Sequence, residues 1–169
     1  MATTTLHATC CAAPGNGDGD PQGVLLTGPS GSGKSDLALR LIDAGFRLVA
    51  DDLVDLAAEG GAVIASGLPR EGALIEVRGL GVIRLAAAAA RARVVLVVAL
   101  AAAGAQERLP APSHATLVGL AVPLVTIDPS GSSAVARIRL ALSVLGGGAV
   151  SVAGALGDAP SSPAGRGGP

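Results

Sequence analysis

Aromatic residues are almost absent from this chain of 169 residues, in which Phe46 is the single Phe, Tyr or Trp. Its core must therefore be built from Leu, Val, Ile and Ala, which bury less area per side chain than aromatic residues do. No charge of one sign dominates: 12 basic and 13 acidic residues leave a formal net charge of −1. With so few and such scattered basic residues, the chain is not expected to bind nucleic acid or an anionic membrane surface.

Cysteines and long apolar runs are also scarce. Cys10 and Cys11 are the only two cysteines, and because they are adjacent they suit neither a structural disulfide nor a zinc site. The longest apolar stretch, residues 94–103, is too short to span a bilayer and fits a buried strand better. The N-terminus lacks the basic segment and apolar run of a secretory signal. We therefore expect a cytoplasmic protein with reduced, buried thiols.

The most informative segment is a glycine-rich loop that fits G-x-x-x-x-G-K-[ST] at every fixed position. The residues before it (23–27) predict a buried strand, and the apolar spacing after it predicts a helix over 35–44. Strand, glycine loop and helix form the context in which this motif binds phosphate through backbone N–H groups. We expect nucleotide binding by Gly28, Pro29, Ser30, Gly31, Ser32, Gly33, Lys34 and Ser35, with Ser35 also on Mg²⁺.

The remaining pattern predicts one α/β domain over residues 1–148 and a disordered Gly/Pro/Ala/Ser-rich tail over 149–169. Turn residues between short strands indicate hairpins, and therefore a mixed sheet rather than strict β-α-β alternation. Further strands are expected at 3–12, 46–50, 53–57, 62–65, 72–77, 94–100 and 124–127, and further helices at 85–91 and 130–145.

Two acidic groups are candidates for phosphoryl-transfer chemistry. Asp51 and Asp52 end a predicted strand, and both can face one site only if the chain bends there. One would then act as a base toward the acceptor and the other toward the metal, or the pair is simply a solvated turn. Glu76 and Arg78 share one side of an extended run and could hold Mg²⁺ and phosphate, or form an exposed ion pair of little consequence. His7, beside the glycine-loop strand, could orient a carboxylate or be an ordinary strand residue.

Three sequence blocks together resemble one family. They are the glycine loop with its flanks (26–39), the run Gly-Phe-Arg-Leu-Val-Ala-Asp-Asp at 45–52, and the run Ile-Glu-Val-Arg-Gly-Leu-Gly-Val-Ile at 75–83. In this order and spacing they are similar to the catalytic domain of HPr kinase/phosphorylase, over about residues 7–83. The loop alone is shared by many enzymes, whereas the third block is far more specific.

The resemblance implies a P-loop domain related to phosphoenolpyruvate carboxykinase, commonly hexameric, which uses ATP and Mg²⁺ to phosphorylate a serine of the phosphocarrier protein HPr. In many members phosphate reverses the reaction by phosphorolysis. It implies a short form of the family that carries the catalytic domain alone. It also implies Asp51 and His7 as catalytic residues, Asp52 and Glu76 beside Ser35 as metal ligands, and Arg78 in the nucleotide site.

Two other interpretations remain open at this point. A small-molecule P-loop kinase would need a substrate-binding lid, and no Arg-rich insertion that could form one is visible. A nucleotide-binding regulatory module with little turnover would keep the glycine loop but have little need of Asp51. The C-terminal half, where the family's arginine-bearing loop is replaced by an alanine run ending in Arg91, matches the family least.

Overall fold

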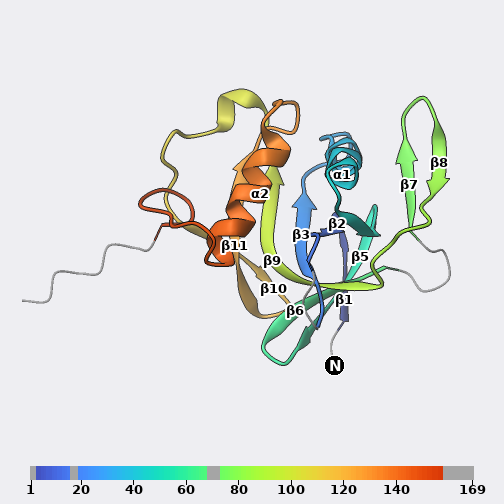
Figure 1. Cartoon of the computed structure of the whole chain (residues 1–169), viewed down its shortest axis with the longest axis horizontal. Helices are drawn as coiled ribbons and strands as arrows, with labels where there is room; N and C mark the ends of the chain where they lie inside the picture. The colour runs from blue at the N-terminus through green and yellow to red at the C-terminus, as the bar shows by residue number, and fades with distance from the viewer. Residues whose placement is uncertain (1–2, 16–18, 68–72, 158–169) are drawn as a thin grey trace, which may run out of the picture.

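The computed structural model describes residues 3–15, 19–67 and 73–157 (Figure 1). Its strands are β1 Thr3–His7, β2 Thr9–Ala12, β3 Gln22–Thr27, β4 Arg47–Ala50, β5 Leu53–Glu59, β6 Ala62–Ser66, β7 Leu74–Val77, β8 Gly81–Arg84, β9 Arg91–Leu100, β10 Ser113–Leu117 and β11 Leu120–Ile127. Its helices are α1 Lys34–Asp43 and α2 Ala134–Leu145, with a 3₁₀ turn η1 at Ala103–Ala105.

The main sheet is mixed. β9 pairs in parallel with β3 on one side and, at its C-terminal end, with β11 on the other. The remaining pairs are antiparallel, and the main path runs β1-β5-β6-β9-β3-β2-β4 with β10 outside β11. The mixed sheet and the hairpins predicted from the sequence are therefore confirmed.

The sheet curls because two strand pairs bend at the same place. Ala8 separates β1 from β2, and Asp51 and Asp52 separate β4 from β5. β1 pairs with β5 whereas β2 pairs with β4, so the two broken strands run alongside each other across the bend. The Ala8 N–H donates to the Asp52 carbonyl at 3.1 Å and holds the two breaks together. We call this bend, formed by residues 7–9 and 51–52, the corner.

Apolar residues fill both faces of the central strands. On β3, Leu26 faces the helices, packing with Leu37 and Leu41 of α1 and Ile138 of α2, all fully buried. Its neighbour Leu25 faces the inside of the curled sheet. This alternation follows from the two-residue repeat of a strand, and it explains the continuous apolar run of β3 and β9.

The β7–β8 hairpin forms a separate two-stranded sheet that projects beside α1 (Figure 1). Ile75 anchors it, because this side chain is buried in the core beside α1. Leu80 and Val82 lie near its tip and are largely exposed.

Several segments differ from the sequence predictions, among them strand β8, which was not predicted. No helix forms at 85–91: residues 85–90 are irregular, with bends and one isolated bridge to β4, and the Ala89 N–H donates to the Leu48 carbonyl on the open side of β4 at 2.9 Å. Alanine favours a helix, but an unpaired strand edge offers this backbone a better partner. Strand β10 was not predicted, and α2 begins at Ala134 rather than residue 130 because residues 130–133 form turns.

The predicted tail lies partly within the described residues. Residues 149–157 contain no helix or strand, and Leu156 packs against the core. Residues 158–169 lie outside the described part of the chain, so the domain boundary at 148 stays a prediction. Within the described residues, no helix has the length and apolar character needed to cross a membrane.

Candidate functional site

The glycine loop joins the C-terminal end of β3 to the N-terminus of α1, as predicted. Gly33 precedes the helix with φ of 96°, a left-handed conformation that glycine adopts without strain. A Cβ on Gly28 would lie only 2.7 Å from the Ser32 hydroxyl oxygen, so a side chain there would displace Ser32. The Ser32 hydroxyl is buried and has no hydrogen-bond partner among the described residues.

The Lys34 side chain folds back onto the glycine loop that precedes it. Only 6% of the residue is exposed, and its ammonium Nζ donates to the carbonyls of Gly28 at 2.9 Å and Pro29 at 3.0 Å. No described carboxylate pairs with this buried ammonium, so an anion entering the loop would be strongly favoured there.

Asp51 lies directly behind Ser35. The Ser35 hydroxyl is 3.0 Å and 3.1 Å from the two carboxylate oxygens of Asp51. The Thr9 hydroxyl donates to Oδ1 of the same carboxylate at 2.7 Å. Asp51 therefore faces the glycine loop and the inside of the corner, and it does not line the cavity described below.

Asp52 faces the opposite way because the backbone reverses at this residue. Its φ is 72°, and the Leu53 N–H donates to the Asp51 carbonyl at 2.9 Å, which closes a γ-turn of the rare positive-φ kind. The Asp52 side chain is 79% exposed, and its Oδ1 lies 2.9 Å from Nε2 of His7. The expected bend is present, and it sends the two neighbouring carboxylates to different partners.

A cavity of about 480 Å³ brings the predicted residues together. The glycine loop supplies Lys34 and Ser35, and the corner supplies His7 and Asp52. The first strand of the projecting hairpin ends in this cavity, and Glu76 and Arg78 both line it, as does Val77 between them. The full lining is His7, Ser30, Gly31, Gly33, Lys34, Ser35, Asp36, Leu39, Asp52, Glu76, Val77 and Arg78.

The metal-binding prediction lacks a preformed cluster. Among the described residues, no group of three or more His, Cys, Asp and Glu side chains is placed to hold a metal ion. Ser35, Asp52 and Glu76 nevertheless line the same cavity. Mg²⁺ commonly takes one or two protein oxygens together with water and substrate phosphates, and this donor set fits that mode.

Thr9 is the site residue that the sequence analysis missed. It is fully buried on β2 between Ala8 and Cys10, and its contact with Asp51 depends on strand pairing. The available signal was a polar residue within a run of small apolar ones.

The cysteines are buried thiols, as predicted. Burial raises the pKa of Cys10 to about 12. Burial, followed by the charges of Cys10 and Asp51, also raises the pKa of Cys11. Neither thiol is suited to nucleophilic or metal chemistry near neutral pH.

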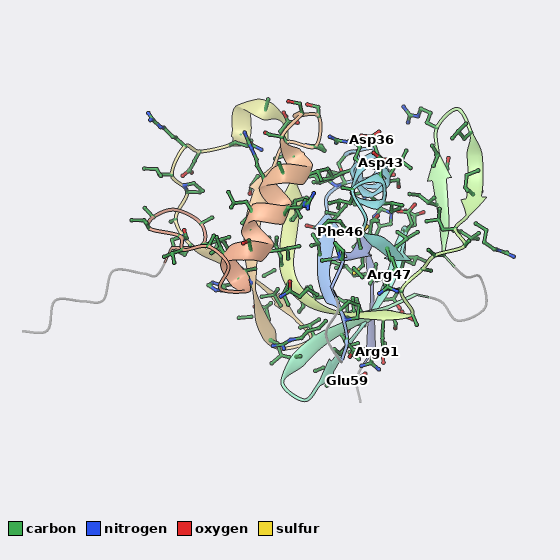
Figure 2. The ribbon with its side chains drawn as sticks, in the orientation of Figure 1. Asp36, Asp43, Phe46, Arg47, Glu59 and Arg91 are labelled. Atoms are coloured by element: carbon green, nitrogen blue, oxygen red, sulfur yellow. The ribbon has the colours of Figure 1, made fainter. Side chains whose placement is uncertain are left out.

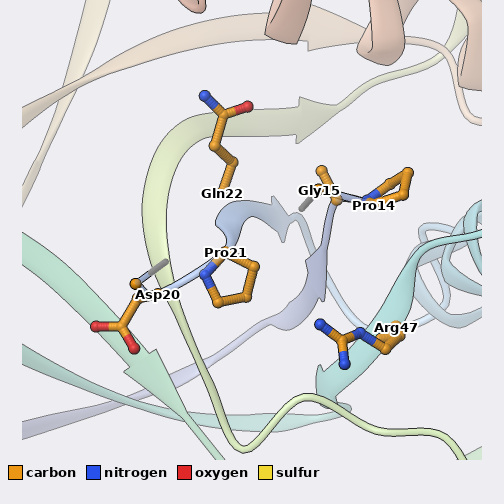
Figure 3. A pocket seen from close by; sticks show the side chains of 8 residues that line it. Pro14, Gly15, Asp20, Pro21, Gln22 and Arg47 are labelled. Carbon is orange, nitrogen blue, oxygen red and sulfur yellow. The ribbon is translucent and has the colours of Figure 1, made fainter. Parts of the chain in front are cut away.

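A second, smaller cavity of about 220 Å³ lies between the β2–β3 connection and Arg47 (Figure 3). None of the predicted site residues lines it. Arg91 is not among its lining residues, and Figure 2 shows it beside Glu59 near the lower edge of the sheet. Its guanidinium lies 2.6 Å from Glu59 and 2.9 Å from Asp20, which ties β9 to the β5–β6 hairpin and to the segment before β3.

Fold and site together define a mixed α/β domain with a curled sheet, whose glycine loop has the P-loop sequence pattern. A family model described as the HPr Serine kinase C-terminal domain matches residues 18–142, and the chain belongs to this family. The resemblance drawn from the sequence blocks is thereby confirmed.

Individual relatives agree with the family. The HPr kinase/phosphorylase of Clostridium tetani is 52% identical over 61 residues, which are 36% of this chain and 20% of that protein. The HPr kinase/phosphorylase of Treponema pallidum is 48% identical over 65 residues, 37% of this chain and again 20% of the relative. The matched segments thus span about a fifth of the length of these relatives.

A solved structure extends the likeness to most of the fold. The Hpr(Ser) kinase/phosphatase of Coxiella burnetii matches with a TM-score of 0.68 and 28% identity, covering 86% of this chain and 96% of that one. The likeness therefore includes the C-terminal part of the chain, where the motifs were weakest.

Proposed function

We propose that this chain is an ATP-dependent protein-serine kinase that phosphorylates an HPr-type phosphocarrier in the cytoplasm, with Mg²⁺ as its cofactor. The observation that carries the proposal is the convergence of Lys34, Ser35, Asp52 and Arg78 on one cavity. Family membership supports the same activity. Phosphorolysis, the reverse reaction, would use the same groups with inorganic phosphate as the acceptor.

The glycine loop would bind the triphosphate. Among the described residues Lys34 has no countercharge and the buried Ser32 hydroxyl has no partner, so a phosphate group would satisfy both. Loop N–H groups and the start of α1 add further donors. Arg78, across the cavity on the hairpin, would contact the phosphates from the other side.

The metal would bind at Ser35. Mg²⁺ would neutralise charge that develops between the β- and γ-phosphates during transfer. Ser35 can offer its oxygen lone pairs to the ion while its O–H donates to Asp51, and Glu76 supplies a carboxylate to the same cavity.

The geometry supports a different division of roles between Asp51 and Asp52 from the one expected from the sequence. That expectation gave the catalytic role to Asp51. Both oxygens of Asp51 already lie within hydrogen-bond distance of Ser35, and Asp51 is not among the residues that line the cavity. Asp52 is exposed at the cavity and paired with His7. We therefore propose that Asp52 accepts the proton and that His7 orients Asp52. Asp51 would act on the metal side of the site, through Ser35.

The strained backbone at Asp52 favours this assignment. A non-glycine residue at positive φ costs free energy and persists only when its surroundings impose it. Here the reversal is what directs Asp52 into the cavity while Asp51 stays behind Ser35.

The transfer itself then needs little covalent help from the protein. The serine oxygen bonds to the γ-phosphorus while the bond from that phosphorus to the bridging β–γ oxygen breaks and ADP leaves. The serine proton passes to the Asp52 carboxylate, late in a loose transition state. Lys34, Arg78 and the loop N–H groups stabilise the charge on the transferring group.

Intact-mass analysis of HPr incubated with the chain, ATP and Mg²⁺ tests the proposal. We expect one added phosphate with the wild type and none with Lys34→Ala. Asp52→Asn should slow transfer by about 10²- to 10⁴-fold, the usual contribution of a positioned base, without weakening ATP binding. Asn also tolerates positive φ, so this variant adds no strain to the turn.

Asp51→Asn is the matched comparison at the neighbouring position. This variant should instead weaken the binding of Mg²⁺. Equal transfer rates for the wild type and Asp52→Asn would contradict the assigned acceptor. ATP binding without transfer to HPr by the wild type would favour the regulatory module or another acceptor, including a small molecule.

A further inference from the structure

Thr9 is an unusual residue for the interior of this sheet. It and Lys34 are the two buried polar or charged residues of the described chain, and Thr9 has no exposed surface. Its neighbours Ala8, Cys10 and Cys11 are small and apolar. A buried hydroxyl needs a partner, and within the described part of the chain the Thr9 side chain donates to Asp51 alone, at 2.7 Å.

The position of Thr9 is set by strand pairing. β2 lies between β3 and β4, and Thr9 pairs with Leu26 just before the glycine loop. The next residue, Cys10, pairs with Ala50, the last residue of β4. Thr9 therefore lies at the corner beside Asp51, on the face of β2 that also carries Cys11 toward α1.

The orientation of Asp51 controls what Ser35 can offer to a cation. A serine hydroxyl has one proton and two lone pairs, so donating the proton to Asp51 leaves its lone pairs free. If the carboxylate rotates, the hydroxyl rotates with it. The bond from Thr9 is the interaction that fixes the carboxylate independently of Ser35.

We propose that Thr9 is a positioning residue for the divalent cation, acting through Asp51 and Ser35. This inference rests on the proposed function, because the cation is the one that accompanies the nucleotide. Groups that orient metal ligands without touching the metal change its affinity by about 10- to 100-fold when removed. Removing the Thr9 hydroxyl should change the cation affinity by an amount at the lower end of this range. The reason is that Thr9 acts on Asp51, which itself only supports the ligand Ser35.

Thr9→Val tests the role, since valine keeps the β-branched shape and removes only the hydroxyl. The full chain is titrated with MgCl₂ at a fixed concentration of a fluorescent ATP analogue, and the analogue is also titrated in EDTA. We expect the Mg²⁺ midpoint to rise about tenfold in Thr9→Val, with affinity in EDTA changing less than about twofold. A purely structural role would change both affinities together or neither.

Two further variants make the test specific. Thr9→Ser keeps the hydroxyl and should keep the wild-type midpoint, whereas Thr9→Ala should behave like Thr9→Val. This Ser/Ala pair also decides the question if the valine variant fails to fold. Thr5→Val is the matched control, because the Thr5 hydroxyl donates to Asp55 at 2.5 Å on the exposed part of β1, and its midpoint should not move.

The possible failures are distinguishable. An unchanged midpoint in both Thr9→Val and Thr9→Ala, with a wild type that responds to Mg²⁺, overturns the role of Thr9 and leaves the kinase proposal standing. An equal shift in Thr9→Ser and Thr9→Ala also overturns it, because the hydroxyl would then be irrelevant. A wild type that binds the analogue equally with and without Mg²⁺ overturns the role of Thr9, whereas the kinase proposal is decided separately by phosphate transfer to HPr.

Discussion

Arg40 joins three parts of the nucleotide-binding half of the molecule, and its removal should have a measurable effect on stability. From α1, its guanidinium donates to the backbone carbonyls of Pro129 and, at 3.4 Å, Gly131, while Nε lies 3.3 Å from Asp36. Pro129 in turn packs against the glycine loop, because its ring atoms lie 3.3 Å from where a Cβ on Gly33 would be. Arg40 therefore fixes the segment before α2 against both α1 and the loop.

The expected magnitude follows from these contacts. A hydrogen bond from a charged donor contributes about 1.5–3 kcal/mol, and Arg40 makes one close bond and one long one. The side chain is 32% exposed, so water replaces part of what is lost, and the i,i+4 pair with Asp36 adds little. We expect Arg40→Met to lower the free energy of unfolding by about 2 kcal/mol, or roughly 4–8 °C in Tm.

Urea denaturation followed by far-UV circular dichroism, together with calorimetry, measures this change. Arg137→Met is the matched control, because Arg137 donates to the Gln106 side chain at 2.7 Å in an exposed position. It should cost less than about 0.5 kcal/mol. Equal losses for the two variants, or a loss below about 0.5 kcal/mol for Arg40→Met, would refute the reasoning.

Two further predictions concern the turn before β11 and the buried thiols. Val118 has φ of 44° in the two-residue turn it shares with Gly119, a strained conformation for a β-branched residue. Val118→Asn should raise the free energy of unfolding by about 1 kcal/mol in urea denaturation, and a loss of stability would contradict the strain. Because burial raises the pKa of Cys10 to about 12, both native thiols should react with a thiol-specific reagent at pH 8 only after denaturation, as a colorimetric assay can show. The same shift makes stability fall as pH rises from about 9 toward 12, since the unfolded thiol ionises first, and Cys10→Ala should reduce that fall.

Local patterns predicted the parts of the fold that local interactions determine. The glycine loop, its flanking strand and α1 came from spacing and turn residues, and α1 begins within one residue of the predicted start. The segment at 85–91 was mistaken for a helix because its alanines favour one, whereas the open edge of β4 decided its conformation. No sequence pattern reveals an edge that exists only after the sheet has formed.

The candidate site shows the same limit. His7, the two aspartates, Glu76 and Arg78 could be named from motifs, and all but Asp51 line one cavity. Which aspartate faces the cavity depends on the γ-turn at Asp52, and the role of Thr9 depends on the pairing of β2. Both are products of strand register, which a residue pattern does not specify.

The corner also has a consequence for how the molecule folds. The β5–β6, β7–β8 and β10–β11 hairpins close over a few residues and can form early, whereas the β1–β5 pairing joins distant segments and carries a larger loop-closure entropy. The pairing of His7 with Asp52 depends on this non-local strand pairing. A chain in which β1 failed to pair with β5 would keep its glycine loop and α1 but would lack His7 beside the proposed proton acceptor. Such a misfolded population would bind nucleotide and turn it over poorly.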